Sequence, residues 1–466
     1  MTYLDIDQQE AFERQILGDL FDAFSSRRIR YGILRNFENL PHGIDGTDID
    51  ILVHPNDLVA TLEEIHKTAW SNVAQFAKSY QDDMITQLVM TKRSTENALL
   101  TLKIDVLHNR QVMGIQFLSA EEMLRDLRTH NGVSVVSELV MLIDKWSFHL
   151  LLGAPLDAKY AAEFATIAKQ QKDAVTGLLE RFLPEYRACQ LVEALIEGEG
   201  ATLKLNRRER MHAFLRLWRA QGILAVPRTL RFVYSRIRDA LRPDGVFLSI
   251  SGPDGSGKTT VIDLVSEQLS QIYGQNAVTY AHFRPTVLPR IAEVAKKARA
   301  VETIDENYDQ PHRAKPSGLL GSSARLAYYW LDYLWGYYRS VLPVLKRRDV
   351  MLFDRYYYDM IADGFRSRIS LPTPLLLGMG RLLPLPKHAF FISVSPDEIH
   401  RRKQELTMER IIALNDRYGD LADRGWLTHI DNNGAPEIAA SAIVDHIVAD
   451  RDTRDRRFKA RQNQTK

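Results

Sequence analysis

Gly252-Pro253-Asp254-Gly255-Ser256-Gly257-Lys258-Thr259-Thr260 is the stretch that decides the fold of the second half of this chain. It follows an apolar run at 246–250, typical of a buried strand, and precedes a helical pattern at 258–272. Gly255 and Gly257 allow backbone angles that other residues resist, so that consecutive N–H groups can converge on phosphate oxygens. The positive end of the helix dipole adds to the attraction. The stretch therefore predicts a phosphate-binding loop between a strand and a helix.

The residue types of this loop suit a nucleoside triphosphate. Lys258 is expected to neutralise the β- and γ-phosphates, and Thr259 to hold Mg²⁺ through its hydroxyl. ATP and Mg²⁺ are therefore the cofactors that the pattern implies. The residues expected to bind the nucleotide are Gly252, Asp254, Gly255, Ser256, Gly257, Lys258, Thr259 and Thr260. An ordinary glycine-rich turn is the alternative, and the flanking strand and helix argue against it.

Strand and helix patterns alternate beyond the loop. Further strands are expected at 350–353 and 389–394, with helical patterns between them. Such alternation indicates an α/β fold in which helices cover both faces of a parallel sheet.

Two segments of this region resemble thymidylate kinases. The sequence of the glycine-rich loop is similar to that of their loop. Asp354-Arg355-Tyr356 resembles the family's segment in which a carboxylate ends a strand at the magnesium and an arginine bridges both phosphates. The resemblance implies an ATP-dependent phosphotransferase with a P-loop kinase domain. Lys258, Asp354 and Arg355 would act in catalysis, Asp354 and Thr259 would hold the metal, and Asp254 would face the acceptor. A surface Asp-Arg pair is the simpler alternative.

The resemblance extends to a lid and to the last strand, and it covers roughly residues 246–450 in the right order. A basic cluster follows the strand at 389–394, where the family closes a lid over ATP; its members are Arg401, Arg402, Lys403 and, less favoured, Arg410. Arg402 is the one assigned to catalysis, and a solvated basic helix face is the alternative. Thr428-His-Ile-Asp431-Asn432 is similar to the family's last strand and adenine-side loop, which implies that Asp431 and Asn432 lie near the base.

The acceptor side departs from that family. Where thymidylate kinases carry Arg-Glu-Pro-Gly-Gly, this chain has Ala281-His-Phe-Arg284-Pro285, which leaves Arg284 as an acceptor-binding candidate. Asp332-Tyr333 replaces the family's Asp-Arg pair, and the residues that read a thymine ring are not recognisable. The expected acceptor is a nucleoside monophosphate or a related molecule, and a sugar or glycan end stays open. Four aromatic side chains could stack on a sugar, although plain helix packing is the favoured interpretation: Tyr328, Trp330, Tyr333 and Trp335.

The N-terminal region resembles the nucleotidyltransferase superfamily. Strands are expected at 31–34, 49–53 and 99–107, and alternation along a strand puts Asp48 and Asp50 on one face. Asp105 resembles the superfamily's third carboxylate, so the resemblance implies that these three aspartates hold Mg²⁺. Arg35-Asn36 stands where the superfamily has the Gly-Ser or Gly-Gly pair that accepts the triphosphate. An active transferase and a degenerate domain that only binds an acceptor or a partner both stay open, with the second favoured.

The length of 466 residues indicates two or three domains. We expect a small nucleotidyltransferase-like α+β domain at 1–115, a helical domain and linker at 116–243, the P-loop domain at 244–450, and a frayed charged tail at 451–466. Two enzyme hypotheses follow, a kinase of the thymidylate kinase type and a bifunctional nucleotidyltransferase and kinase acting on a sugar or glycan in surface-polysaccharide synthesis. Lys258 and Asp354-Arg355 argue against a third, a nucleotide-gated interaction module without catalysis.

Residues 227–242 combine apolar side chains with Arg228, Arg231, Arg236, Arg238 and Arg242. A basic amphipathic helix on a membrane or on acidic lipid-linked material is one interpretation. A solvated helix that joins two domains is the interpretation that we favour.

Composition limits the other functions. The formal net charge of +2 predicts no general affinity for nucleic acid, and the expected partners are a nucleotide and a phosphate-accepting small molecule or glycan. The single cysteine, Cys189, excludes an intramolecular disulfide, fits a reducing compartment and is expected to be buried and inert. Neither a signal-peptide pattern nor an apolar stretch long enough to cross a bilayer is visible, so we expect a cytoplasmic protein. A homodimer stays open.

Overall fold

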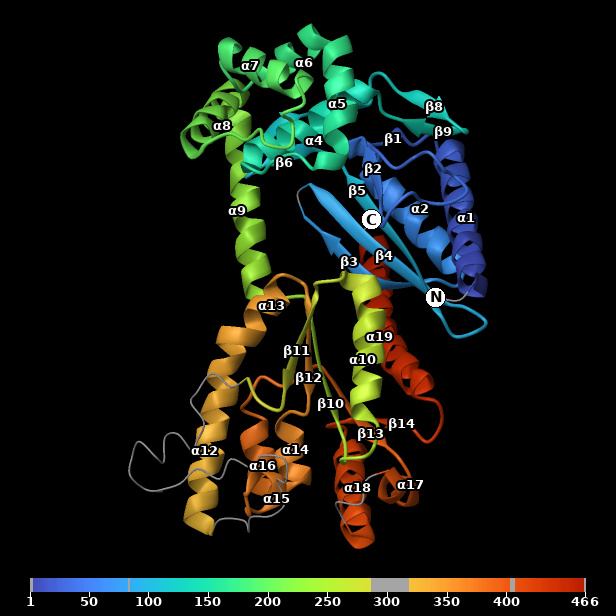
Figure 1. The fold of residues 1–466 in the computed structure, drawn as a ribbon, viewed down its shortest axis with the longest axis vertical. Coiled ribbons are helices and arrows are strands. Elements are labelled where there is room, and N and C mark those ends of the chain that lie inside the picture. The colour runs from blue at the N-terminus through green and yellow to red at the C-terminus, as the bar shows by residue number, and fades with distance from the viewer. Residues whose placement is uncertain (1–2, 83, 286–317, 403–406, 465–466) are drawn as a thin grey trace. The chain divides into compact units, whose positions relative to one another are not determined.

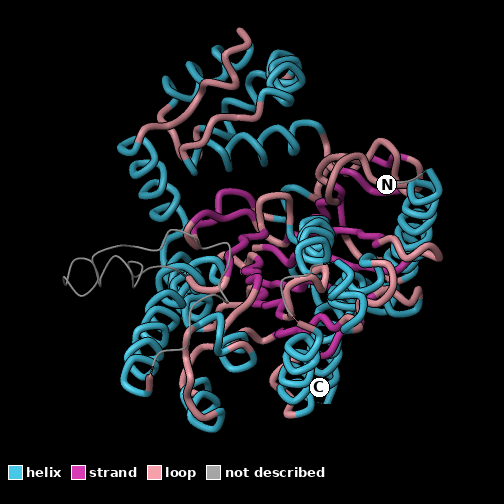
Figure 2. The backbone as a smooth tube through the Cα atoms, turned by 60° about the horizontal axis from the view of Figure 1, so that its bottom comes forward, coloured by secondary structure: helices cyan, strands magenta, loops and turns pink. Residues whose placement is uncertain are grey.

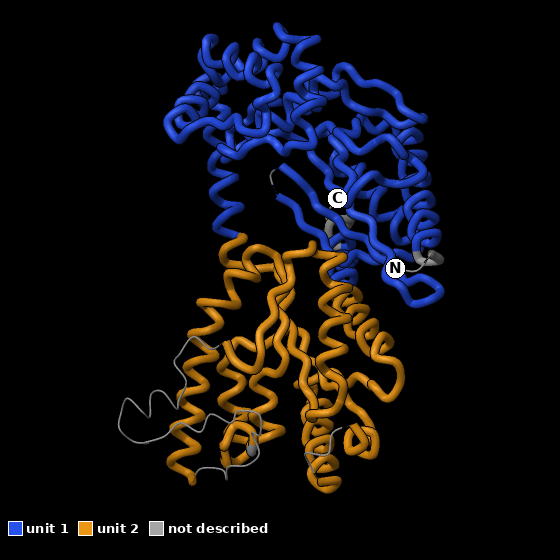
Figure 3. The backbone as a smooth tube through the Cα atoms, viewed as in Figure 1, with its two compact units in different colours: residues 1–238, 451–466 blue, residues 239–450 orange. Residues whose placement is uncertain are grey.

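The computed structural model describes residues 3–82, 84–285, 318–402 and 407–464. Helices and strands make up much of these ranges (Figure 2). The chain divides into two compact units, the first formed by residues 1–238 together with 451–466 and the second by residues 239–450 (Figure 3). Residues 1–115 and 116–238 both fall in the first unit, and residues 239–243 fall in the second.

The second unit is built on a five-stranded sheet with the strand order β11-β12-β10-β13-β14. The strands are β10 (Val246–Ser251), β11 (Val278–His282), β12 (Val350–Asp354), β13 (His388–Ser393) and β14 (Thr428–Asp431). All neighbouring strands are parallel, so each connection must cross over the sheet. The predicted parallel sheet is confirmed. It gathers the carboxyl ends of β10 and β12 at one edge, where the predicted phosphate-binding loop begins after β10 and Asp354 ends β12.

Helices supply the crossovers of this unit (Figure 1). They are α10 (Lys258–Tyr273), α12 (Leu319–Gly336), a π-helical turn at Tyr337–Val341, α13 (Leu342–Lys346), α14 (Tyr357–Ala362), α15 (Gly364–Ser367), α16 (Thr373–Gly380), α17 (Pro396–Arg402) and α18 (Met408–Asp423). The last helix, α19 (Pro436–Gln464), follows β14 and continues into the residues that belong to the first unit. Aromatic side chains fill much of the core, with Phe247, Phe353 and Tyr356 in mutual edge contact.

The first unit contains a seven-stranded mixed sheet with the order β3-β4-β5-β2-β1-β9-β8. The strands are β1 (Tyr31–Ile33), β2 (Ile49–Val53), β3 (Gln75–Gln81), β4 (Ile85–Arg93), β5 (Leu99–Leu107), β8 (Arg128–His130) and β9 (Val133–Val135). The expected strands at 31–34, 49–53 and 99–107 are present. The section 116–243, expected to be helical, also contains the strands β8 and β9, because Asn131 and Gly132 have positive φ values of 47° and 82° and turn the chain into a hairpin.

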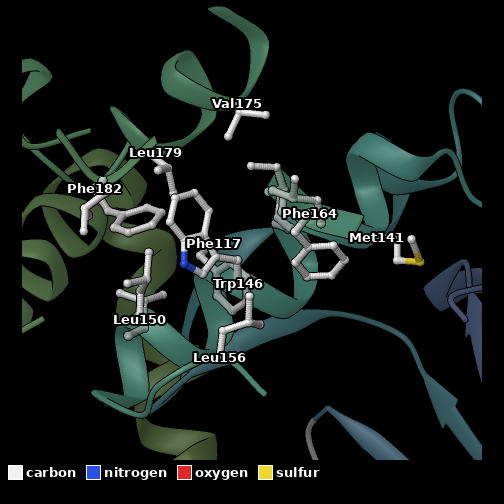
Figure 4. Close-up of a cluster of buried hydrophobic side chains, with 14 of the residues drawn as sticks. Phe117, Met141, Trp146, Leu150, Leu156, Phe164, Val175, Leu179 and Phe182 are labelled. Carbon is white, nitrogen blue, oxygen red and sulfur yellow. The ribbon is translucent and has the colours of Figure 1, made fainter. Parts of the chain in front are cut away.

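Helices and a small hairpin complete the first unit. They are α1 (Tyr3–Ser26), a 3-10 turn at Pro55–Asp57, α2 (Leu58–Ser71), β6 (Arg110–Val112), β7 (Ile115–Leu118), α3 (Ala120–Met123), α4 (Glu138–Leu152), α5 (Ala158–Gln170), α6 (Lys172–Leu179), α7 (Glu185–Ile196), α8 (Arg207–Gln221), η2 (Gly222–Leu224) and α9 (Ala225–Leu241). The helical part packs around the fully buried Trp146, beside Phe117 and Leu179 (Figure 4). Cys189 on α7 is half-buried. None of the helices in the described ranges has the length and apolar character needed to cross a membrane.

The expectation of a frayed tail at 451–466 is wrong over its described part, because residues up to Gln464 continue α19. Asp452 is buried in the first unit, where its Oδ1 accepts hydrogen bonds from Trp70 Nε1 at 3.0 Å and from the backbone N–H of Phe76 at 3.1 Å. The guanidinium of Arg456 lies 4.5 Å from the centre of the Trp70 ring. A run of charges that looks solvated in the sequence thus supplies partners to α2 and β3.

Candidate active site

Three glycines with positive φ give the phosphate-binding loop its path between β10 and α10. The φ values are 154° at Gly252, 90° at Gly255 and 79° at Gly257, which is the N-cap of α10. A Cβ at Gly252 would lie 2.7 Å from the carbonyl oxygen of Ile392. A Cβ at Gly257 would lie 2.9 Å from Asn432 Nδ2 and 3.3 Å from Arg402 Nη1. The loop therefore requires glycine at these positions, and Asn432 and Arg402 border it.

Lys258 opens α10 and its side chain is buried against the loop. Its Nζ donates to the carbonyl oxygen of Pro253 at 2.9 Å and lies 3.9 Å from Asp254 Oδ1. Burial, followed by the charge of Arg355, lowers the pKa of Lys258 to about 7. An anionic polyphosphate beside it would favour the charged ammonium, so this lysine is suited to hold phosphate.

Asp354 ends β12 next to the loop. Its Oδ2 lies 2.9 Å from His282 Nδ1, while its Oδ1 is buried and has no hydrogen-bond partner among the described residues. Burial acts against the charged form, but the hydrogen bond from His282 and the charges of Lys258 and Arg355 lower the pKa of Asp354. A buried, ionised oxygen without a donor suits a cation. With the exposed Thr259 in the first turn of α10, these donors fit Mg²⁺.

Arg355 is held by a buried network that sequence reasoning missed. Its Nη1 donates to Asp359 Oδ1 at 3.0 Å, and Tyr418 on α18 donates its hydroxyl to the same oxygen at 2.7 Å. Ser251, the last residue of β10, donates to Asp359 Oδ2 at 2.6 Å. Burial acts against the charge of Arg355, but Tyr418, Asp359 and Asp254 raise its pKa, so the guanidinium stays charged. The i,i+4 spacing of Arg355 and Asp359 was the available signal.

Asp254 lies between two arginines. It accepts hydrogen bonds from Arg355 Nη2 and from Arg366 Nη1, the latter at 2.8 Å. Arg366 comes from α15 and was not identified in the sequence, because nothing local links it to a residue 112 positions away. The carboxylate expected to face the acceptor thus also orients two cations beside the loop.

The expected lid residues lie in different surroundings. Arg402 pairs with Glu398 at 2.6 Å and reaches Gly257, whereas Arg401 pairs with Glu398 at 2.7 Å and is largely exposed. Lys403 lies outside the described residues, and Arg410 lies on α18. Asn432 Nδ2 donates to the carbonyl oxygen of Ser256 at 2.8 Å, so this side chain supports the phosphate loop. Asp431 bonds to Asn433 at the surface.

On the acceptor side, Arg284 is engaged inside the protein. It forms a buried ion pair with Asp332 at 2.7 Å and lies 4.6 Å from the centre of the Tyr329 ring. Of the four aromatic candidates, Tyr333 is buried and donates to the carbonyl oxygen of Phe283 at 2.9 Å, and Trp330 donates to that of Met379 at 3.0 Å. Tyr328 is half-buried and Trp335 is exposed. Helix packing thus accounts for Trp330 and Tyr333.

A second cluster lies in the first unit, where the structure brings Asp48, Asp50 and Asp105 together with carboxylate oxygens within 4.8 Å of one another. Arg35 Nη2 lies 2.5 Å from Asp50 Oδ2. Arg35, which occupies the position of the superfamily's Gly-Ser or Gly-Gly pair, thus contacts the cluster. Burial, followed by the charge of Asp50, raises the pKa of Asp105 to about 7. The carboxylates suit a divalent cation in number and spacing, and Arg35 already neutralises one of them.

Several known proteins are similar to part of this chain. Thymidylate kinase from Enterococcus faecalis is 28% identical over 173 residues, which are 37% of this chain and 74% of that protein. Thymidylate kinase from Prochlorococcus marinus strain AS9601 is 29% identical over 212 residues, 44% of this chain and 92% of that protein. The crystal structure of thymidylate kinase from Ehrlichia chaffeensis, 19% identical, matches 44% of this chain and all of its own with a TM-score of 0.31.

No protein-family model matches the chain. The sequence relatives are thymidylate kinases and are 22–31% identical to this chain over the matched residues. They cover about two fifths of the chain, so the similarity concerns one region. This chain contains a phosphotransferase of the kinase type, in a region similar to thymidylate kinases.

Proposed function

We propose that this protein transfers the γ-phosphoryl group of ATP to a nucleoside monophosphate or a related acceptor. The observation that supports it best is the convergence of Lys258, Asp354 and Arg355 on one glycine-rich loop. Lys258 comes from α10, Asp354 from the end of β12, and Arg355 directly follows Asp354. In the proposed function these three side chains surround the triphosphate.

Each of these side chains has a distinct task in the proposed reaction. Lys258 binds the β- and γ-phosphates, and Arg355, fixed by Asp359 and Tyr418, contacts the transferred group and the acceptor phosphate. Fixed cations lower the barrier because negative charge spreads over the phosphoryl group during transfer. Asp354 and Thr259 would hold Mg²⁺, which when bound neutralises the phosphate oxygens. Arg402 adds a cation beside Gly257.

Two observations bear on the acceptor. The relatives are named thymidylate kinases, which favours a nucleoside monophosphate. Arg284, however, is neutralised by Asp332, and the residues that read thymine are not recognisable. We therefore propose that dTMP is a poor acceptor in comparison with the physiological one.

A second candidate function rests on the three aspartates of the first unit. A bifunctional enzyme would use Asp48, Asp50 and Asp105 for nucleotidyl transfer to a sugar or glycan in surface-polysaccharide synthesis. The gathering of the three carboxylates supports it, and the contact of Arg35 with Asp50 counts against it.

An ADP-release screen across nucleoside monophosphates, sugars and lipid-linked glycans tests the kinase. Lys258→Ala should reduce turnover on the best acceptor to below about a tenth of wild type, because a cation is lost from the transition state. Lys346→Ala, at the exposed end of α13, is the matched control and should leave turnover unchanged. Retained turnover in Lys258→Ala would refute the proposal. Turnover on dTMP at about 1–100 per second would refute the statement on the acceptor alone.

A further inference from the structure

Helix α9 presents a continuous apolar stripe to solvent. Within the first unit its exposed apolar side chains are Val226, Leu230, Val233, Tyr234 and Ile237, with 42–67% of each exposed. Their spacing of three and four residues puts them on one side of the helix. Ile223 and Leu224 of η2, directly before α9, are also exposed. Such a row is uncommon on a protein surface and marks an interaction site.

The opposite side of α9 is the one that holds the helix to its own unit. A Cβ at Gly114, in the turn between β6 and β7, would lie 2.9 Å from the carbonyl oxygen of Arg228 and 3.0 Å from Phe232 Cβ. Arg228 Nη1 donates to Gln221 Oε1 at 3.1 Å, and Ser235 is buried. With about 100° between successive residues, Arg228, Phe232 and Ser235 lie on the side away from the stripe. The packing within the first unit thus fixes the stripe outward.

Arginines border the stripe on both sides. By the same helical geometry, Arg231 and Arg238 lie along one edge and Arg236 along the other. Between Glu209 and Asp239 the sequence has seven arginines and no acidic residue, whereas the whole chain has a formal charge of only +2. Four of the seven arginines lie on α9 itself, whereas Arg210 and Arg216 of α8 donate to the carbonyl oxygens of Leu152 and Leu183. Positive charge is therefore concentrated on the helix that carries the exposed apolar row.

We propose that η2 and the outer face of α9 dock on the surface of an anionic lipid bilayer. An apolar stripe between arginines is the arrangement that lets a helix lie in the headgroup region, with its apolar side chains in the acyl boundary. Anionic headgroups attract the arginines. Tyr234 suits the boundary between acyl chains and water, because its ring is apolar and its hydroxyl is polar. The first unit thus carries the protein to a membrane, independently of the kinase chemistry of the second.

Vesicle flotation with the full-length protein tests the proposal. Phosphatidylcholine vesicles with about a third phosphatidylglycerol should bind the protein at least about tenfold more tightly than pure phosphatidylcholine, since each arginine near the surface contributes about fivefold. Raising the salt to about 0.5 M should release much of it, because exposed charges are then screened within a few ångströms. Equal binding to both vesicles, or no binding, would overturn the proposal.

Two variants separate the apolar from the charged contribution. Leu230→Ser with Ile237→Ser should lower binding at least about tenfold, and Arg231→Gln with Arg236→Gln about twenty-five-fold. The matched controls are Ile438→Ser, an exposed isoleucine of α19, and Arg347→Gln, an exposed arginine after α13, and both should bind as wild type. Reduced binding by a control to the same extent would overturn the assignment to α9.

The competing occupant is a second copy of this chain. If sedimentation shows a dimer that Leu230→Ser with Ile237→Ser converts to a monomer, the stripe is an interface between copies and the proposal is wrong. ATP turnover without vesicles and the thermal unfolding midpoint should stay at wild-type values in every variant, which separates this proposal from that on the kinase. Should the serine pair not fold, the glutamine pair and the salt series decide.

Discussion

Arg35 and Asp50 form an ion pair, 2.5 Å from Nη2 to Oδ2, inside a group of three aspartates whose spacing suits a divalent cation. A built-in guanidinium and a metal ion compete for the same carboxylate oxygens. Arg35 is therefore a counter-ion inside the first unit. Metal binding there requires that Arg35 move, that Asp50 bind through Oδ1, or that only Asp48 and Asp105 take part.

Arg35→Gln should tighten binding of Mn²⁺ or Mg²⁺ to the first unit by about tenfold, because it removes a competing charge worth about 1.4 kcal/mol. Calorimetric titration of the full-length protein without nucleotide measures it, with Asp354→Asn in every titrated variant so that the candidate metal site of the second unit does not contribute. Asp50→Asn should weaken metal-dependent nucleotide binding by this unit and leave the kinase reaction unchanged. If the wild type and Arg35→Gln both fail to bind a divalent ion, the transferase hypothesis is wrong.

Tyr418→Phe should lower kcat about tenfold with little change in the KM for ATP. The hydroxyl bonds to Asp359, which orients Arg355, so its loss loosens a cation that acts mainly in the transition state. Steady-state kinetics on the best acceptor provides the measurement. Tyr338→Phe, at an exposed position of the π-helical turn, should behave as wild type. An unchanged kcat in Tyr418→Phe would show that Arg355 does not need this support.

Asp452→Ala should destabilise the first unit by about 2–3 kcal/mol. The buried N–H groups of Trp70 and Phe76 would both lose their acceptor. Urea unfolding of the full-length protein measures the change, and Asp423→Ala, exposed at the end of α18, is the control. Equal stability of the two variants would mean that the C-terminal part of α19 contributes little to this unit.

His66 should make the first unit less stable in mild acid. Burial beside Trp70 and Phe76 lowers its pKa from 6.5 to about 4. The folded state disfavours protonation of His66. The free energy of unfolding therefore has its full value above pH 6.5 and falls by up to about 3 kcal/mol as the pH drops toward 4. Thermal unfolding of wild type and His66→Phe between pH 7 and 4 tests it. The difference in unfolding midpoint between wild type and His66→Phe should change with pH. A difference that stays constant would show that His66 does not cause the loss of stability in acid.

Local patterns predicted the second unit well. The strands at 246–250 and 350–353 and the helix at 258–272 lie within a residue of their observed ends, because a buried parallel strand is an unbroken apolar run and the loop glycines mark the start of α10. The resemblance to the nucleotidyltransferase superfamily, and not a local pattern, implied that Asp48, Asp50 and Asp105 lie close together. Their proximity in the structure arises because β2 and β5 are adjacent and pair Asp50 with Asp105.

Contacts between distant positions account for what the sequence did not reveal. Arg366 reaches Asp254, and Tyr418 reaches Asp359, through tertiary packing that leaves no periodic trace. In the sequence, Asp452 is one residue of a charged run that is typical of a solvated tail. Its role depends on Trp70 and Phe76, which are distant in the sequence and donate hydrogen bonds to it in the structure. The hairpin of β8 and β9 was missed for a different reason, since Asn131-Gly132 is a recognisable turn signal within a mostly helical region.

The two hydrogen bonds to Asp452 have a consequence for biosynthesis. A ribosome translates residues 1–238 first, but the acceptor for Trp70 and Phe76 emerges only after the whole second unit has been made. The second unit can fold on the nascent chain while the first still lacks this partner. During synthesis, the nascent first unit therefore has to keep the donors of α2 and β3 hydrated until its last helix arrives.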